Sequence, residues 1–150
     1  MSVSFINSLP EPIKIWSAKS IAGIIVADGR VTDSEIAILR ESISFLKDGA
    51  MINEIVEMVK NREKPKLPVL KIDRKIASNM LMALAVVALS DDNLNPQEIQ
   101  YFNYIAARLG FETGFAKLVI SWCKDYVNLT KKKNDILKKG EQTRPIYVSL

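Results

Sequence analysis

Residues 76–90, Ile-Ala-Ser-Asn-Met-Leu-Met-Ala-Leu-Ala-Val-Val-Ala-Leu-Ser, contain no charged side chain. Their apolar side chains cover every side of a helix, which is typical of a helix that is buried in a core or lies in a membrane. The stretch has 15 residues, including the polar Ser78 and Asn79, whereas a membrane-spanning helix needs about 20. We therefore expect the central helix of a protein core, almost wholly buried from Ile76 to Leu89.

Apolar residues recur at three- and four-residue steps on both sides of this stretch, as they do in amphipathic helices. The spacing predicts further helices over residues 13–25, 33–46, 50–61, 96–109 and 112–127. Residues 62–68 hold two prolines among charged side chains and predict a connector between two of these helices. No alternating pattern is long enough to build a sheet. The sequence thus predicts an all-α fold, a single helical bundle of about six helices.

The length of 150 residues suits one domain, with residues 1–127 as the helical domain and residues 128–150 as a basic C-terminal tail. We expect a short helix near Ile136 and Leu137 within this tail. The net charge of +4 is unevenly distributed. Residues 1–57 carry 5 basic and 8 acidic side chains and residues 76–123 carry 2 and 4, whereas residues 58–75 carry 7 and 2 and residues 124–150 carry 7 and 3. The chain therefore has no uniformly basic surface.

The absence of histidine excludes several classes of chemistry: Ser-His-Asp catalysis, Cys-His catalysis and histidine-bound zinc. Cys123 is the single cysteine, so the chain forms no internal disulfide and no cysteine metal cluster, and we expect a buried, inert thiol. A single cysteine favours a reducing compartment, and residues 1–10 lack the basic start and apolar run of a signal peptide. These features predict a cytoplasmic protein without a transmembrane segment.

One acidic motif occurs twice, 63 residues apart. The first copy is Ala-Asp-Gly-Arg-Val-Thr-Asp-Ser-Glu-Ile at residues 27–36, and the second is Ser-Asp-Asp-Asn-Leu-Asn-Pro-Gln-Glu-Ile at residues 90–99. Each copy follows one apolar helix and opens another. The repeat therefore predicts two helix-loop-helix units related by pseudo-symmetry within the bundle.

Helix capping explains part of this motif. Thr32 and Glu35 have the spacing of a capping box, in which the hydroxyl and the carboxylate each accept from a backbone N–H at the helix start. Asn95 and Glu98 have the same spacing, with a proline at the first helical position. We expect Gly29 to supply the positive φ that ends the preceding helix. On this interpretation both glutamates only start helices.

Capping does not account for the two aspartates, Asp28 and Asp91. We expect both in the last turn of an apolar helix, where the helix dipole disfavours a carboxylate by roughly 0.3–1 kcal/mol. A bound cation would make a carboxylate favourable at this position, because the free carbonyls and carboxylates of a helix end are hard oxygen ligands. Three explanations for the two aspartates therefore remain open: they bind a metal ion, they bind a cationic partner, or they are surface charges that the fold tolerates. The second loop is not an EF-hand, because Pro96 stands where such a loop needs glycine and Phe102 where it needs glutamate.

The paired acidic motif, together with Ile-Ala-Ala-Arg-Leu-Gly-Phe at residues 105–111, resembles the TerB family of tellurite-resistance-associated domains. The resemblance covers about residues 15–127 and departs from the family at Asp92, where glycine is usual. It implies a helical bundle with its acidic residues on one face, which binds metal and joins stress-response assemblies near the membrane. Residue by residue, the metal ligands that it implies are Asp28, Glu35, Asp91 and Glu98.

Two functions therefore remain open. The first is a non-catalytic TerB-like module that binds a divalent metal, Ca²⁺, Mg²⁺ or Mn²⁺ before Zn²⁺, and mediates interactions with protein partners. The second is an adaptor whose basic connector and tail bind an anionic surface, lipid or nucleic acid, while the acidic loops serve only as helix caps. No aromatic residues are interleaved with the lysines of the tail, so nucleic acid is not expected. We expect no enzyme, because carboxylates near solvent lack an evident substrate cleft.

Overall fold

The computed structural model describes residues 2–89 and 94–148, and within them every regular element is a helix. The helices are α1 (Ser2–Asn7), α2 (Glu11–Val26), α3 (Asp33–Ser42), α4 (Gly49–Lys60), α5 (Arg74–Ala88), α6 (Pro96–Arg108) and α7 (Thr113–Gln142). The all-α prediction is confirmed. The count differs from the expected six because the short α1 precedes the first expected helix.

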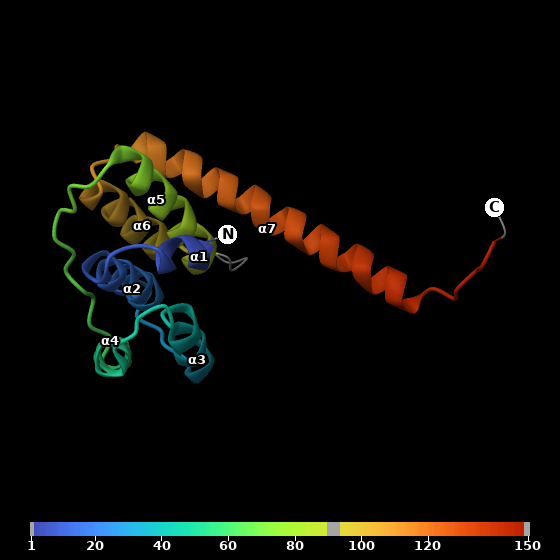
Figure 1. Ribbon diagram of the computed structural model, residues 1–150, viewed down its shortest axis with the longest axis horizontal. Coiled ribbons are helices and arrows are strands. Elements are labelled where there is room, and N and C mark those ends of the chain that lie inside the picture. Colours follow the sequence, from blue (N-terminus) through green and yellow to red (C-terminus); the bar gives the residue numbers. More distant parts are fainter. Residues whose placement is uncertain (1, 90–93, 149–150) are drawn as a thin grey trace.

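Helices α2, α5 and α6 lie at the centre of the bundle, and α1 packs on α5 (Figure 1). Helices α3 and α4 pack on each other and on α2, at the end of the bundle farthest from α7. Helix α7 packs on α5 and α6 through its first half, and its second half projects away from the bundle. Along the chain the first copy of the acidic motif lies between α2 and α3 and the second between α5 and α6. The pseudo-symmetry of the two units stays a prediction.

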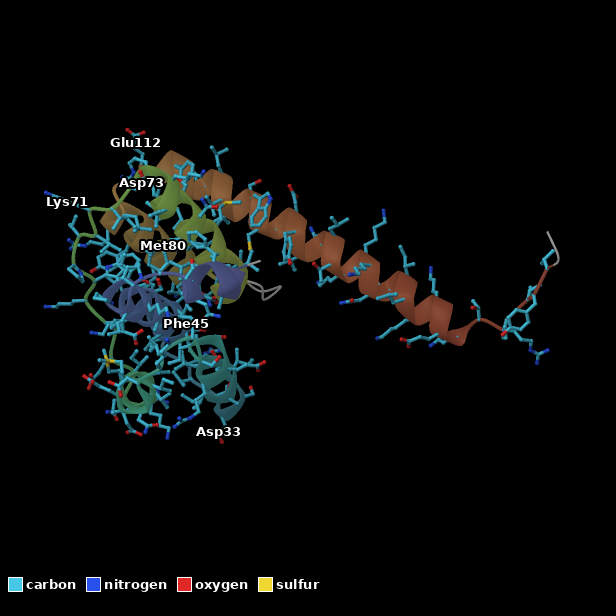
Figure 2. All side chains as sticks on the ribbon, in the orientation of Figure 1. Asp33, Phe45, Lys71, Asp73, Met80 and Glu112 are labelled. Atoms are coloured by element: carbon cyan, nitrogen blue, oxygen red, sulfur yellow. The ribbon has the colours of Figure 1, made fainter. Side chains whose placement is uncertain are left out.

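Helix α5 contributes large side chains to the core, but it is not almost wholly buried as expected. Met80, labelled in the interior in Figure 2, is fully buried together with Leu81 and Leu84. By contrast, Asn79 is exposed and several neighbours are only half-buried. Ser78 and Asn79 donate to carbonyl groups one turn back in the same helix, at 2.7 and 2.8 Å. Their side-chain donors therefore have hydrogen-bond partners without another helix covering this part of α5.

Helix α2 is more enclosed than α5, although its sequence contains charged and hydroxyl residues. From residue 13 to residue 27 no side chain is exposed. Ser17 and Ser20 are buried because their hydroxyl groups donate to Ile13 O and Trp16 O, each at 2.9 Å. The central position in the core therefore belongs to α2 as much as to α5.

The connector between α4 and α5 is held against the bundle by aromatic side chains. Tyr101 Oη donates to Pro65 O at 2.9 Å, Tyr104 Oη accepts from Leu67 N at 3.0 Å, and the indole of Trp16 donates to the next proline of the connector. These bonds satisfy backbone groups that have no partner in a helix. The predicted connector is confirmed, and it follows one fixed path over α2 and α6.

The C-terminal tail differs from the expectation. Helix α7 does not end at Val127 but continues to Gln142, so no separate short helix forms near Ile136. The physical reason is that residues 115–139 contain no glycine or proline, and Gly140 comes only two residues before the helix ends. Every side chain from residue 128 to residue 148 is exposed.

Truncation after Val127 is expected to leave the melting temperature nearly unchanged, because residues 128–148 bury no side chain in the bundle. Differential scanning calorimetry of the full and truncated chains measures this. A truncated chain that melts at a clearly lower temperature would show that the projecting half of α7 contributes to the folding of the bundle.

Candidate functional site

The first acidic loop begins directly after α2, whose C-cap residue is Ala27. Asp28 therefore lies beyond the last turn in which we expected it. Its Oδ1 accepts from Arg30 N at 2.9 Å, and Gly29 has the expected positive φ, of 74°. An aspartate that bonds the backbone two residues on stabilises a turn, so one oxygen of Asp28 has a structural role that the helix-dipole argument did not include.

Thr32 and Glu35 form the predicted capping box at the start of α3. Glu35 N donates to Thr32 Oγ1, and Thr32 N donates to Glu35 Oε1, each at 3.2 Å. The Thr32 hydroxyl also donates to the same carboxylate, at 3.1 Å. The Glu35 carboxylate is therefore engaged in helix capping, as the sequence predicted.

The second acidic loop is described from Leu94 onward, and Asp91 lies outside the described residues. Asn95 caps α6, since its Oδ1 accepts from Glu98 N at 2.8 Å. Its Nδ2 donates to Glu98 Oε1 at 2.5 Å. Val31 and Leu94, at matching positions of the two loops, both pack on the core and anchor the loops.

Asn95 also joins the two loops to each other. Its Nδ2 donates to Asp28 Oδ2 at 3.2 Å, across a separation of 67 residues. One amide group thus lies between two carboxylates, Asp28 from the first copy of the motif and Glu98 from the second. Sequence reasoning identified Asn95 as a helix cap but missed this bridge, because no local pattern signals a contact between residues so far apart.

The predicted ligand set is brought together only in part. Asp28 and Glu98 both accept a hydrogen bond from the side-chain amide of Asn95. Glu35 instead accepts from Thr32 N in the helix cap of α3. Among residues 2–89 and 94–148, no group of three or more Asp, Glu, Cys or His side chains is arranged to hold a metal ion. Because Asp91 lies outside these residues, the four-residue site stays a prediction.

Arg62 is a second contributor that sequence reasoning missed. Its guanidinium Nε donates to Gly29 O at 3.2 Å, next to Asp28 in the chain. Its backbone has a φ of 57°, which glycine normally adopts at a helix end. With Lys60 and the start of α3 it lines a small open pocket. The first loop therefore already has two cationic side chains beside it, those of Arg62 and Lys60.

Cys123 does not belong to this site. The thiol is fully buried beneath α5, where Sγ donates to Ala85 O at 3.3 Å. Burial raises the pKa of the Cys123 thiol, which disfavours the reactive thiolate. The predicted buried thiol is confirmed.

Comparison with known proteins identifies one match. The family described as "Tellurite resistance protein TerB" matches residues 15–118, from the first turns of α2 to the start of α7, and the match includes both acidic loops. Neither the curated proteins nor the solved structures contain a match to the chain. No helix in the described part of the chain has the length and apolar character required to cross a membrane.

Proposed function

Since the chain belongs to the TerB family of tellurite resistance proteins, we propose that it is a non-catalytic module of a stress response whose paired acidic loops bind a divalent cation. The observation that carries the proposal is the meeting of Asp28 and Glu98, one from each loop, on the single amide of Asn95. A cation between these carboxylates compensates two negative charges, whereas the neutral amide offers only two hydrogen bonds. Cation binding would therefore tie the two loops together more strongly than Asn95 does.

The chemistry of these side chains favours a hard cation. The ligand atoms are carboxylate oxygens, which suit Ca²⁺, Mg²⁺ and Mn²⁺, while zinc sites are usually built from nitrogen and sulfur ligands. Asp28 is exposed and Glu98 is half-buried, so water can complete the coordination sphere. Asp91 is the proposed third carboxylate, and Glu35 contributes only if it leaves its helix cap.

The cation-loaded loops are proposed to present a fixed surface to a protein partner. Asp28 and the neighbouring residues at the start of α3 are exposed, and Asp33 marks the tip of that helix in Figure 2. Binding both loops to one ion would reduce the entropy lost when a partner docks on them. This arrangement fits a module that joins stress-response assemblies without chemistry of its own.

Adding millimolar Ca²⁺, Mg²⁺ or Mn²⁺ to chelator-treated protein is expected to raise its melting temperature. The stabilisation grows as RT ln(1 + [L]/Kd), about 2.7 kcal/mol at a hundredfold excess over Kd. Asp28→Asn and Asp91→Asn should each abolish the rise. In chelator, Asp28→Asn should change the free energy of unfolding by no more than about 1 kcal/mol, because asparagine keeps one oxygen for Arg30 N and loses only the hydrogen bond from Asn95.

Two further variants test the geometry. Asp33→Asn removes the same charge from the start of α3, directly after the same loop and without touching Asn95, so it should leave the metal-induced rise intact. Asn95→Asp keeps the helix cap but places another carboxylate against those of Asp28 and Glu98, so it should lower stability in chelator and enlarge the rise with metal. If none of these ions moves the melting temperature of the wild-type protein, the proposed cation binding is wrong.

A further inference from the structure

The second half of α7 carries an apolar face that no other part of the described chain covers. It projects from the bundle in Figure 1. The large apolar side chains on it are exposed, Leu129 by 67%, Ile136 by 60% and Leu137 by 53%. An isolated exposed leucine needs no explanation, but a row of them on one helix marks a binding surface.

These side chains form one stripe. At 100° per residue, Tyr126, Leu129, Ile136 and Leu137 fall within a sector of about 100° of the helix, and Lys133 falls within the same sector. They line a shallow hollow along the helix together with Thr130, Lys132 and Lys133. Four residues of α7 are buried in the bundle: Ala116, Val119, Ile120 and Cys123. By the same count their mean direction lies roughly 100° from that of the stripe, although Val119 and Leu137 point in the same direction. Because Leu129, Ile136 and Leu137 lie in the projecting half of α7, the bundle leaves them open to a flat surface.

The charges beside the stripe select its occupant. Residues 128–144 carry 6 basic and 2 acidic side chains. Two copies of this face would bring like charges together, so pairing of α7 with a second α7 is disfavoured. Lys132 and Lys133 instead suit a surface with an apolar interior and an anionic outer layer. The aliphatic stem of a lysine can lie along apolar groups while its ammonium group extends to the charged layer.

We propose that the projecting half of α7 is an amphipathic anchor that lies on a membrane containing anionic lipids. The apolar stripe enters the boundary between headgroups and acyl chains. Lys132 at its edge and Lys133 within it extend their ammonium groups outward to contact lipid phosphates. Beyond the helix, Ile146, Tyr147 and Val148 are also exposed and add apolar and aromatic side chains at the same end. This surface is separate from the acidic loops, so the proposal does not depend on cation binding.

Co-sedimentation of the full chain with lipid vesicles tests the proposal. The protein should bind vesicles of mixed phosphatidylcholine and phosphatidylglycerol but not vesicles of phosphatidylcholine alone, and added salt should weaken the binding. Replacing two stripe residues in Leu129→Asn/Ile136→Asn should lower the partition coefficient by about tenfold or more, because the burial of each side chain drives insertion. Both residues are exposed, so the variant should fold normally, as circular dichroism and melting will show.

Ile38→Asn is the matched control, because Ile38 is 56% exposed on α3 and lies in the part of the bundle away from α7. It should bind the mixed vesicles as the wild-type protein does. The proposal is overturned if the wild-type protein does not bind them, or if the double variant binds equally well, since charge alone would then be responsible. A dimer in ultracentrifugation that the double variant loses, without vesicle binding, would assign the stripe to a second copy and also overturn it.

Discussion

Leu84→Ala is expected to lower the free energy of unfolding by about 2–5 kcal/mol, which is the usual range for a large-to-small change in a core. Leu84 is fully buried on α5, and that helix packs on α1, α2 and α7. Removal of its side chain leaves a cavity that neighbours on several helices would have to fill. Urea denaturation followed by circular dichroism measures the loss.

Leu129→Ala is the matched control, because it makes the same chemical change where the side chain is 67% exposed. Its effect should stay within about 0.5 kcal/mol, the range of surface substitutions. A loss of that small size for Leu84→Ala would place Leu84 on the surface and contradict the packing of α5.

The fold class could be predicted because the apolar spacing is helical over most of the chain. The uncharged stretch located α5, and α4 was predicted to within one residue at each end. The central place of α2 could not be predicted in the same way, because Lys14, Ser17 and Ser20 interrupt its apolar pattern with charged and hydroxyl groups. The serines are buried at little cost since they bond their own helix, and Lys14 Nζ lies 4.0 Å from Glu11.

The length of α7 was underestimated for a different reason. The prediction ended the helix where the strong apolar pattern ended, at Val127. An exposed helix needs no continuous apolar face, only residues that favour helix and no residue that breaks it. The basic composition of the tail therefore indicated exposure correctly but gave no information on secondary structure.

Half of the candidate site was visible in the sequence. The capping box of Thr32 and Glu35 was predicted because its two residues lie three apart, within one turn. The bridge from Asn95 to Asp28 and the bond from Arg62 to Gly29 could not be predicted, because each spans 33 or more residues. Local patterns report helix ends, whereas the meeting of two loops depends on how the helices between them pack.

Gly23→Ala is expected to be the other strongly destabilising substitution, although alanine normally favours a helix over glycine by about 0.5–1 kcal/mol. A Cβ atom at Gly23 would lie 2.1–2.2 Å from three atoms of the Tyr101 side chain. The ring has little room to move, because it packs against Tyr104 and its hydroxyl holds the connector at Pro65. Overpacking costs about 1–3 kcal/mol of stability. Together with the loss of that hydrogen bond, it should lower the free energy of unfolding by about 2–4 kcal/mol.

A double-mutant cycle with Tyr101 separates this clash from a general effect on α2. In a Tyr101→Leu background the obstructing atoms are gone, so Gly23→Ala should become neutral or slightly stabilising, as helix propensity alone predicts. In a Tyr101→Phe background the ring remains, so the substitution should still be costly. Gly140→Ala, at a helical glycine with open space around it, should stabilise or change nothing. If Gly23→Ala stabilises the wild-type protein, the Tyr101 ring cannot lie against α2, and the path of the connector over α6 would have to differ as well.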